Sequence, residues 1–464
     1  MAMGRRKDRA RTPGLWIAAS ELPATGGHPF YRRLNQVLDA HGFDDFVETQ
    51  CTPFYADGVG RPSLTPGTYF RLLLIGYFEG IDSERGIAWR TADSLALRGF
   101  LGLGLDETPP EHSTISRTRR LIDVETHRSV FTWIVQVLAA TNLVKGSTIG
   151  IDATTLEANA ALRSIVRRDS GETYQAFLTQ LAQASGIETP TRADLARLDR
   201  HRPKKGRNAD WQHPHDPDAR ITKMKDGRTH LAHKAEHAVD LDTGAIVGVT
   251  VQGADQGDTT TIAETLTTAT EELEAAAAAT DGETAVIDEV VADKGYHSNQ
   301  VLVDLAALDL RTYIAEPERG RRKWTRHPAA RDAVYGNRRR IRGTRGRRLQ
   351  RRRSEYLERP NAHLYETGGM RRTHLRGHTN ILKRLLIHVG GFNLGLLMRA
   401  VFGVGTPRSL QGQLAALIAV IVALWDALHG VWRPHDTPSV DLAGPFTPQH
   451  RLELLPVEAS ACGL

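Results

Sequence analysis

Short runs of apolar residues that end in an aspartate predict two strands of a buried sheet. Residues 286–291 hold four Val or Ile residues, and the run ends at Asp293. So many β-branched residues over so short a length favour a strand over a helix. The same pattern occurs earlier, where Ile149 and Ile151 precede Asp152. We therefore expect two buried strands, each of which delivers one carboxylate.

The positions of these two aspartates suggest a shared chemical site. Gly295 follows Asp293 by two residues, where glycine permits positive φ or a close approach of the backbone to a ligand. A carboxylate at the carboxyl end of a buried strand, beside such a turn, lies where open α/β sheets bind ligands. The alternative is that Asp293 only caps the turn or the next helix, and that Asp152 is an ordinary polar residue at a strand end. Two such strands in one domain favour the shared site.

The N-terminal part of the chain shows helical spacing. Apolar residues recur at helical intervals in residues 30–42, Pro66 suits the first turn of a second helix, and Ser83 can cap a third. A Gly- and Pro-rich segment at 99–110 then breaks the pattern. These features predict an all-helical domain.

Residues 111–120 have the features of the reading helix in a helix-turn-helix protein. Ser113 can cap a short helix, and the polar side chains after it suit contacts to DNA. The DNA-binding residues predicted here are Ser113, Ser116, Arg117, Arg119 and Arg120. The alternative is an ordinary capped helix with a solvated basic face, because the motif has no strict residue code.

Residues 157–228 are predicted to be an insertion after the Asp152 strand. Helical segments are expected at 173–184 and 193–200. The four potential metal ligands of this region are His213, His215, Asp216 and Asp218. Their spacing matches no tight ligand template, and the prolines between them predict an irregular loop instead.

The segments that follow the insertion complete a mixed sheet with helices on its faces. Residues 229–251 predict a β-hairpin around the turn at 240–244. A helix from Asp258, the Asp293 strand, a helix from Ser298 and a strand at 311–315 come next. Strands that alternate with helices in this order are typical of an α/β domain.

The C-terminal third contains two apolar helical segments. Residues 379–399 form a strongly amphipathic pattern that is expected to cover the sheet. Residues 414–425 predict a further buried helix or a partner face, and the Pro-rich tail after His435 is expected to be poorly ordered. The predicted domains are thus 1–143, helical and DNA-binding; 144–405, catalytic, with the insertion; and 406–464, a helix and a flexible tail.

Composition excludes several classes of protein. Cys51 and Cys462 are the only cysteines in the sequence, which leaves neither a disulfide framework nor a clustered thiolate metal site and suits a reducing cytoplasm. The apolar stretch behind the basic start is too short for a signal peptide. The longest apolar run, 414–425, is well short of the ~20 residues that a membrane span needs.

Charge is concentrated in one block. Residues 319–353 contain sixteen Arg or Lys residues and one acid, Asp332, whereas the whole chain has a net charge of only +6. An otherwise acidic chain with one dense basic block indicates a polyanionic partner there, and arginine suits bidentate contact with phosphate. The alternative is a solvated, disordered charge run. Pro317, Gly320 and Gly336 argue against a regular helix at its start, whereas a helix from Arg345 would carry Glu355 or Glu358 toward the sheet.

Asp152, Asp293 and a later glutamate would form a pocket of oxygen ligands. Hard divalent cations prefer such a pocket, above all Mg²⁺, which also takes substrate phosphate as a ligand. Two ions about 4 Å apart can activate an attacking oxygen and stabilise a leaving one at phosphorus. Carboxylates beside a basic block therefore predict metal-dependent phosphoryl transfer on nucleic acid. The sequence lacks the Gly-x4-Gly-Lys-Ser/Thr loop of nucleotide hydrolases.

Five segments in order resemble the DDE-class transposases of bacterial insertion sequences. They are Ser83-Glu-Arg-Gly-Ile-Ala-Trp-Arg, His112-Ser-Thr-Ile-Ser-Arg, Ile151-Asp-Ala-Thr-Thr-Leu-Glu-Ala-Asn-Ala, Ala292-Asp-Lys-Gly-Tyr-His-Ser and Glu358-Arg-Pro-Asn-Ala-His-Leu-Tyr-Glu-Thr-Gly-Gly. The match covers most of residues 60–405. The resemblance implies a ribonuclease-H-like catalytic domain that cuts the ends of a mobile element and joins the freed 3′ hydroxyl to target DNA.

The resemblance also implies the roles of individual residues. The family's acidic triad falls on Asp152, Asp293 and Glu358, which would bind two Mg²⁺ ions, with Mn²⁺ as a substitute. Glu355 and Glu366 are the alternatives to Glu358. The sequence departs from the family at Pro360-Asn361, where a small residue and an aromatic are more usual, and at Tyr365, where a basic residue is frequent. A proline at that position could end or kink the helix.

The DNA contacts expected beyond residues 111–120 lie beside the second aspartate and in the basic segments. They are Lys294, Arg338, Arg339, Arg340, Arg347, Arg348, Arg351, Arg352, Arg371 and Arg372. The expected partners are double-stranded DNA, as terminal inverted repeats and target, and a second copy of the chain in a homodimer on the DNA ends, with no membrane. The alternatives are a decayed or repurposed DNA-binding protein and a ribonuclease-H-like nuclease without strand transfer.

Overall fold

The computed structural model describes residues 28–56, 63–104, 106–202, 207–224, 226–279, 286–318, 320, 322 and 324–408. The predicted helix at 414–425 and the tail after His435 lie outside these residues. The N-terminal part forms the helices α1 (Pro29–Ala40), α2 (Phe43–Cys51), α3 (Pro66–Glu79), α4 (Glu84–Ala92), α5 (Leu95–Phe100), α6 (His112–Leu121) and α7 (Val124–Ala140), and a 3₁₀ turn, η2 (Thr52–Phe54).

Local sequence sets the starts of these helices. Pro66 opens α3, and the Ser83 hydroxyl accepts a hydrogen bond from the Gly86 amide at the start of α4, both as predicted. Ser113, in contrast, is not a cap. The chain stays extended through Pro110, so Glu111 becomes the N-cap and α6 begins at His112.

A six-stranded mixed sheet forms the centre of the fold, as predicted. Its strands are β1 (Thr148–Glu157), β4 (Arg220–Lys223), β5 (Thr229–Asp240), β6 (Ile246–Gly253), β7 (Glu289–Ala292) and β8 (Arg311–Ile314). The order is β4-β5-β1-β7-β8, and β6 also pairs with β5. β1, β7 and β8 are parallel to one another, whereas β5 is antiparallel to β1, β4 and β6.

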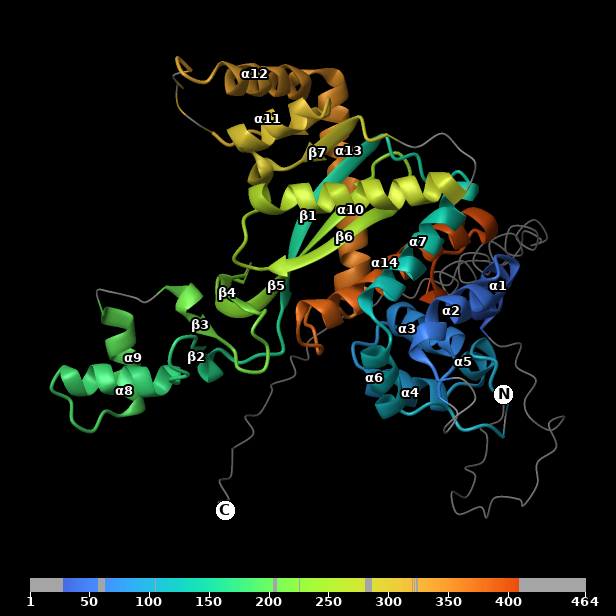
Figure 1. Cartoon of the computed structure of the whole chain (residues 1–464), viewed down its shortest axis with the longest axis horizontal. Coiled ribbons are helices and arrows are strands. Elements are labelled where there is room, and N and C mark those ends of the chain that lie inside the picture. Colours follow the sequence, from blue (N-terminus) through green and yellow to red (C-terminus); the bar gives the residue numbers. More distant parts are fainter. Residues whose placement is uncertain are drawn as a thin grey trace, which may run out of the picture. The chain divides into compact units, whose positions relative to one another are not determined.

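Helices cover both faces of the sheet (Figure 1). α10 (Asp258–Ala279) and α11 (Asn299–Ala307) pack on one face, over Ile149, Ile151 and Val290. The other face is covered by the C-terminal helices α13 (Thr344–Asn361) and α14 (His378–Phe402). Because side chains alternate along a strand, even-numbered residues of β1 face α13 and α14.

α14 is a central helix rather than a one-sided one. It packs in a single apolar core with α3, α7 and the sheet, and that core also includes α1 and α2. Even Lys383, Arg384 and Asn393 are buried. α14 is long and apolar enough to cross a membrane, but 72% of its most apolar window is buried within the protein, as in a core helix of a soluble protein.

The insertion has small apolar clusters of its own. It contains η3 (Leu162–Ser164), β2 (Val166–Arg167), α8 (Tyr174–Ala184), α9 (Arg192–His201), η4 (Asn208–Asp210) and β3 (Trp211–Gln212). Both predicted helices are confirmed, and one face of each packs against the other through Leu178 and Leu195. Figure 1 shows these elements in green.

The basic block is more helical than the sequence predicted. α12 spans Pro328–Arg342 and includes Gly336, because Val334 and Asn337 anchor it to the sheet. The Asn337 side chain accepts a hydrogen bond from the Ile314 amide and donates one to the Ile314 carbonyl. α13 runs through Pro360 and continues as a π-helical turn, η6 (Ala362–Thr367). The proline therefore does not end the helix.

Candidate active site

Asp152 lies on β1, and Asp293 directly follows β7, the strand that runs parallel to β1. β1 and β7 pair through Gly150 and Val291, and the two aspartates stand two residues beyond this pair on their respective chains. Val291 packs toward Leu349 of α13, and its register partner Gly150 lies on the same face of the sheet. Strand alternation therefore puts Asp152, two residues after Gly150, on the face that α13 covers. Both aspartates are partly exposed. Both carboxylates therefore lie just past the carboxyl end of the segment over which these two adjacent strands pair.

α13 runs along this face and contacts both strands. At its start, Arg345 forms a bidentate ion pair with Glu289 at 2.9 and 2.5 Å. Burial raises the pKa of Glu289, but the hydrogen bonds from Arg345, Tyr313 and Thr148 outweigh it and hold the pKa below its usual value. The Gln350 amide donates to the Ala292 carbonyl, at the residue before Asp293. The helix is thus fixed in register with β7.

Further along α13, two side chains reach Asp152. Arg353 lies 3.8 Å from one carboxylate oxygen, and the Asn361 amide donates to the other at 3.5 Å. Sequence reasoning did not select either residue. Both belong to the helical stripe marked by Leu349 and Leu357, which are buried. The helical spacing of Leu349 and Leu357 is the sequence signal that could have identified Arg353 and Asn361 as facing the sheet.

The glutamates of this segment are exposed in the structure. Glu358 and Glu355 point away from the buried stripe of α13, because a helix rotates about 100° per residue and Leu357 takes the inward position. Glu355 pairs with Arg359 at 2.8 Å, and Glu366 pairs with Arg371. Among the described residues, no group of three or more His, Cys, Asp or Glu side chains is arranged to hold a metal ion.

A buried His–Tyr pair lies beside Asp152. His237 of β5 stands opposite Asp152 in the strand register, and its Nε2 contacts the hydroxyl of Tyr365 from η6. Burial lowers the pKa of His237 to about 3, so the imidazole is neutral at physiological pH. Tyr365, the position at which the resemblance to DDE-class transposases led us to expect a basic residue, is buried. The register of the predicted hairpin relates His237 only to β6, so the sequence held no local signal that would place it next to Asp152.

The turn after Asp293 is tightly built. Asp293 accepts a hydrogen bond from the Gly295 amide at 2.7 Å and so caps the 3₁₀ turn η5 (Lys294–Tyr296). The capping role considered for Asp293 is therefore real. A Cβ at Gly295 would come within 2.4 Å of a carboxylate oxygen of Asp258, so any larger residue would require that side chain to shift. Lys294 is exposed beside the carboxylate.

The arginines predicted to bind DNA fall into two groups. One group has protein partners: Arg119 with Glu84, Arg338 with Glu316, Arg340 with Thr312, Arg352 with Asp242, Arg371 with Glu366, and Arg372 with Glu157 at 3.9 Å. The other group is exposed, namely Arg117, Arg120, Arg339, Arg347, Arg348 and Arg351, together with Ser113, whereas Ser116 is half-buried. Three of the exposed arginines lie on α13, on the same side of the helix as Glu358.

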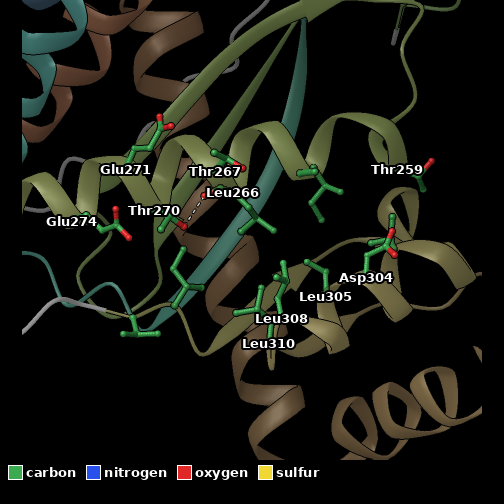
Figure 2. Close-up of a pocket in the computed structure, with 15 residues that line it drawn as sticks. Thr259, Leu266, Thr267, Thr270, Glu271, Glu274, Asp304, Leu305, Leu308 and Leu310 are labelled. Carbon is green, nitrogen blue, oxygen red and sulfur yellow. Dashed lines mark hydrogen bonds between the residues drawn. The ribbon is translucent and has the colours of Figure 1, made fainter. Parts of the chain in front are cut away.

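An apolar cavity lies on the opposite side of the sheet. It has a volume of about 540 Å³ and opens between α10 and α11. Leu266 of α10 and Leu305 of α11 face each other across it (Figure 2). Its lining is mainly apolar and includes neither aspartate of the candidate site. The cavity therefore does not belong to the carboxylate site.

Comparison with known proteins identifies the N-terminal region. Residues 21–121 match the family described as transposase domain (DUF772). No curated protein matches the chain. The family match covers α1–α6 and supports a transposase, which is a DNA-processing protein. It ends before β1 and thus covers neither Asp152 nor Asp293.

Proposed function

We propose that this chain is a DDE-class transposase of an insertion sequence. It would cut DNA at the ends of the element and join the 3′ ends to target DNA. The central support is the placement of Asp152 on β1 and of Asp293 just after the adjacent parallel strand β7, beneath a helix that carries arginines and Glu358. A mixed sheet in which antiparallel strands and parallel strands meet at β1 is compatible with the proposed ribonuclease-H-like fold.

The donor set fits a hard divalent ion. Asp152 and Asp293 are partly exposed oxygen ligands, and the contacts of Arg353 and Asn361 to Asp152 are long enough to be exchanged. These aspartates would hold Mg²⁺ or Mn²⁺. Glu358, which is exposed and faces away from Asp152 in this structure, is the proposed third ligand and would have to turn toward the aspartates to complete the site. When bound, a pair of such ions activates the attacking oxygen and stabilises the leaving one.

The chain's own residues would position the DNA. The exposed arginines of α13 lie on the solvent side of the helix whose inner side reaches Asp152, and they suit the phosphates of a bound strand. α6 would contact the duplex through Arg117 and Arg120. We propose double-stranded DNA and a second copy of the chain as partners, because two ends must be joined, and a cytoplasmic location.

DNA cutting tests this function directly. Duplexes that carry the terminal repeats flanking the reading frame should be nicked with Mg²⁺ and left intact with EDTA. Asp293→Asn should lower the cutting rate by at least about a thousandfold, because a transition-state ligand is lost. Asp288→Asn is the matched control, since Asp288 is exposed at the opposite end of β7. Equal cutting by wild type and Asp293→Asn would contradict the assignment.

One observation favours the second candidate, a DNA-binding protein without catalysis. Asn361 and Arg353 contact the Asp152 carboxylate where a metal ion would bind. The Pro360-Asn361 sequence also departs from the pattern of DDE-class transposases. Binding of the repeat ends with no cut in Mg²⁺ or Mn²⁺ would support this candidate. Cuts without joined products would indicate a nuclease instead.

A further inference from the structure

A buried polar network lies under the Asp293 turn, on the face of the sheet that α10 covers. Its centre is Glu236 of β5, which is 0% exposed and stands opposite Ala153 in the register with β1. The carboxylate accepts hydrogen bonds from Thr261 at 2.9 Å, Thr265 at 2.5 Å and Tyr296 at 2.8 Å. Lys234 lies 3.3 Å from it.

This network is joined to the turn at two points. Tyr296 is the last residue of η5, the 3₁₀ turn that Asp293 caps, and its ring is buried beside Lys234. Asp258, at the start of α10, pairs with Lys234 at 2.7 Å and packs against Gly295. The turn is therefore anchored from below by Tyr296 and from the side by Asp258.

The composition of the network argues for a positional role. A buried carboxylate is costly unless several donors satisfy it, and apolar side chains of similar size would stabilise the same interface at least as well. A fully satisfied polar network instead permits one arrangement, because each donor has a required direction. Here that arrangement fixes β5, α10 and the Asp293 turn relative to one another.

We infer that Glu236 and Tyr296 are positioning residues that hold the Asp293 turn in the geometry the carboxylate site requires. Their relevance to catalysis rests on the proposed function. Neither residue touches the reacting groups. Outer-shell partners of this kind typically change metal affinity by 10–100-fold when they are lost.

The structure offers a closely matched control for Tyr296. Tyr313 is also buried and donates its hydroxyl to a carboxylate, Glu289, at 3.0 Å. Glu289 is the first residue of β7 and lies at the end of that strand away from Asp293. Tyr296→Phe and Tyr313→Phe therefore remove the same group from the same kind of contact, and only the first should disturb the turn.

The test uses the full chain and two readouts. The first is hydrogen exchange at residues 293–298 without metal, which should be at least about tenfold faster in Tyr296→Phe and unchanged in Tyr313→Phe. The second is Mn²⁺ affinity measured by electron paramagnetic resonance, where Tyr296→Phe should raise the dissociation constant by about tenfold. Thr265→Val, which removes another donor to Glu236, should act in the same direction and serves if Tyr296→Phe does not fold.

The outcomes separate this inference from the proposed function. Unchanged exchange at 293–298 in both Tyr296→Phe and Thr265→Val would overturn the inference. Equal changes in Tyr296→Phe and Tyr313→Phe would overturn it too, because they would indicate general loosening. If wild type binds no Mn²⁺ and cuts no DNA, the proposed function fails, and the exchange comparison still decides whether the network holds the turn.

Discussion

Arg119 is buried against Glu84 and Asn380, whereas Arg117, two residues earlier on α6, is exposed. Sequence reasoning assigned both to DNA binding, because a helix made of polar residues does not reveal which side meets the rest of the fold. The positions of α4 and α14 decide it. Lys383 of α14 donates to the backbone carbonyls of Arg119 and Ile122 and so turns this side of α6 inward.

The two arginines should therefore respond differently to truncation. Arg119→Ala leaves the Glu84 carboxylate, which is 14% exposed, without its partner, and this should destabilise the protein by on the order of 2 kcal/mol. Arg117→Ala should leave stability unchanged and reduce affinity for duplex DNA, with a shallower salt dependence. Thermal unfolding and DNA titrations at several salt concentrations measure both effects. A DNA defect in Arg117→Ala that does not depend on salt would contradict the phosphate contact.

Some site residues could not be predicted because contacts between distant segments leave no mark in the local sequence. Asp152 and Asp293 were identified because strand ends and turns are marked locally in the sequence. His237, Arg353 and Asn361 were missed, because their proximity to Asp152 depends on pairing between segments far apart in the chain.

α7 and α10 pack against each other through a buried carboxylate. Glu272 of α10 is 3% exposed, accepts a hydrogen bond from Thr132 of α7 at 2.6 Å and lies 3.9 Å from Arg128. Burial raises its pKa from 4.5 to about 7. The folded protein thus holds this proton more tightly than the unfolded chain does.

This shift predicts a pH dependence of stability. Because the folded-state pKa is raised, the stabilisation is complete below pH 4.5 and is lost as the pH rises through about 7. Glu272→Gln cannot ionise and should not show this loss. Between pH 5 and pH 8, wild type should lose on the order of 3 kcal/mol relative to Glu272→Gln. Thermal unfolding of both proteins across this range measures the difference, and parallel pH profiles would contradict it.

Prediction at the level of elements succeeded where the pattern was local. The hairpin, the Asp293 strand and the insertion helices follow from turn residues and periodicity. The extents of α12 and α13 did not, because Gly336 and Pro360 disfavour helix in isolation. Tertiary contacts override them: Asn337 anchors α12 to β8, and the π turn η6 follows Pro360 without a break in the helical path.

At the scale of the whole molecule, one apolar core includes regions that were predicted from the sequence to be separate domains. Apolar side chains of α1–α7, α14 and the sheet pack together, so the helices that match a transposase domain are continuous with the sheet that carries the aspartates. Such burial stabilises by roughly 25 cal/mol per Å² and ties the two regions together. The periodicity of each helix predicted that it would be buried, but not against which partner.

The central claim is that Asp152 and Asp293 together hold one metal site. Fe²⁺ in place of Mg²⁺, supplied with hydrogen peroxide and with ascorbate to reduce Fe³⁺ again, generates hydroxyl radicals that cut the backbone next to the bound ion. Mass spectrometry locates the cuts in the full chain. We predict cuts near both 152 and 293 in wild type and in Asp288→Asn, and loss of both cuts in Asp152→Asn and in Asp293→Asn. Cuts at only one of the two segments, or at neither, in folded wild-type protein would contradict the shared site.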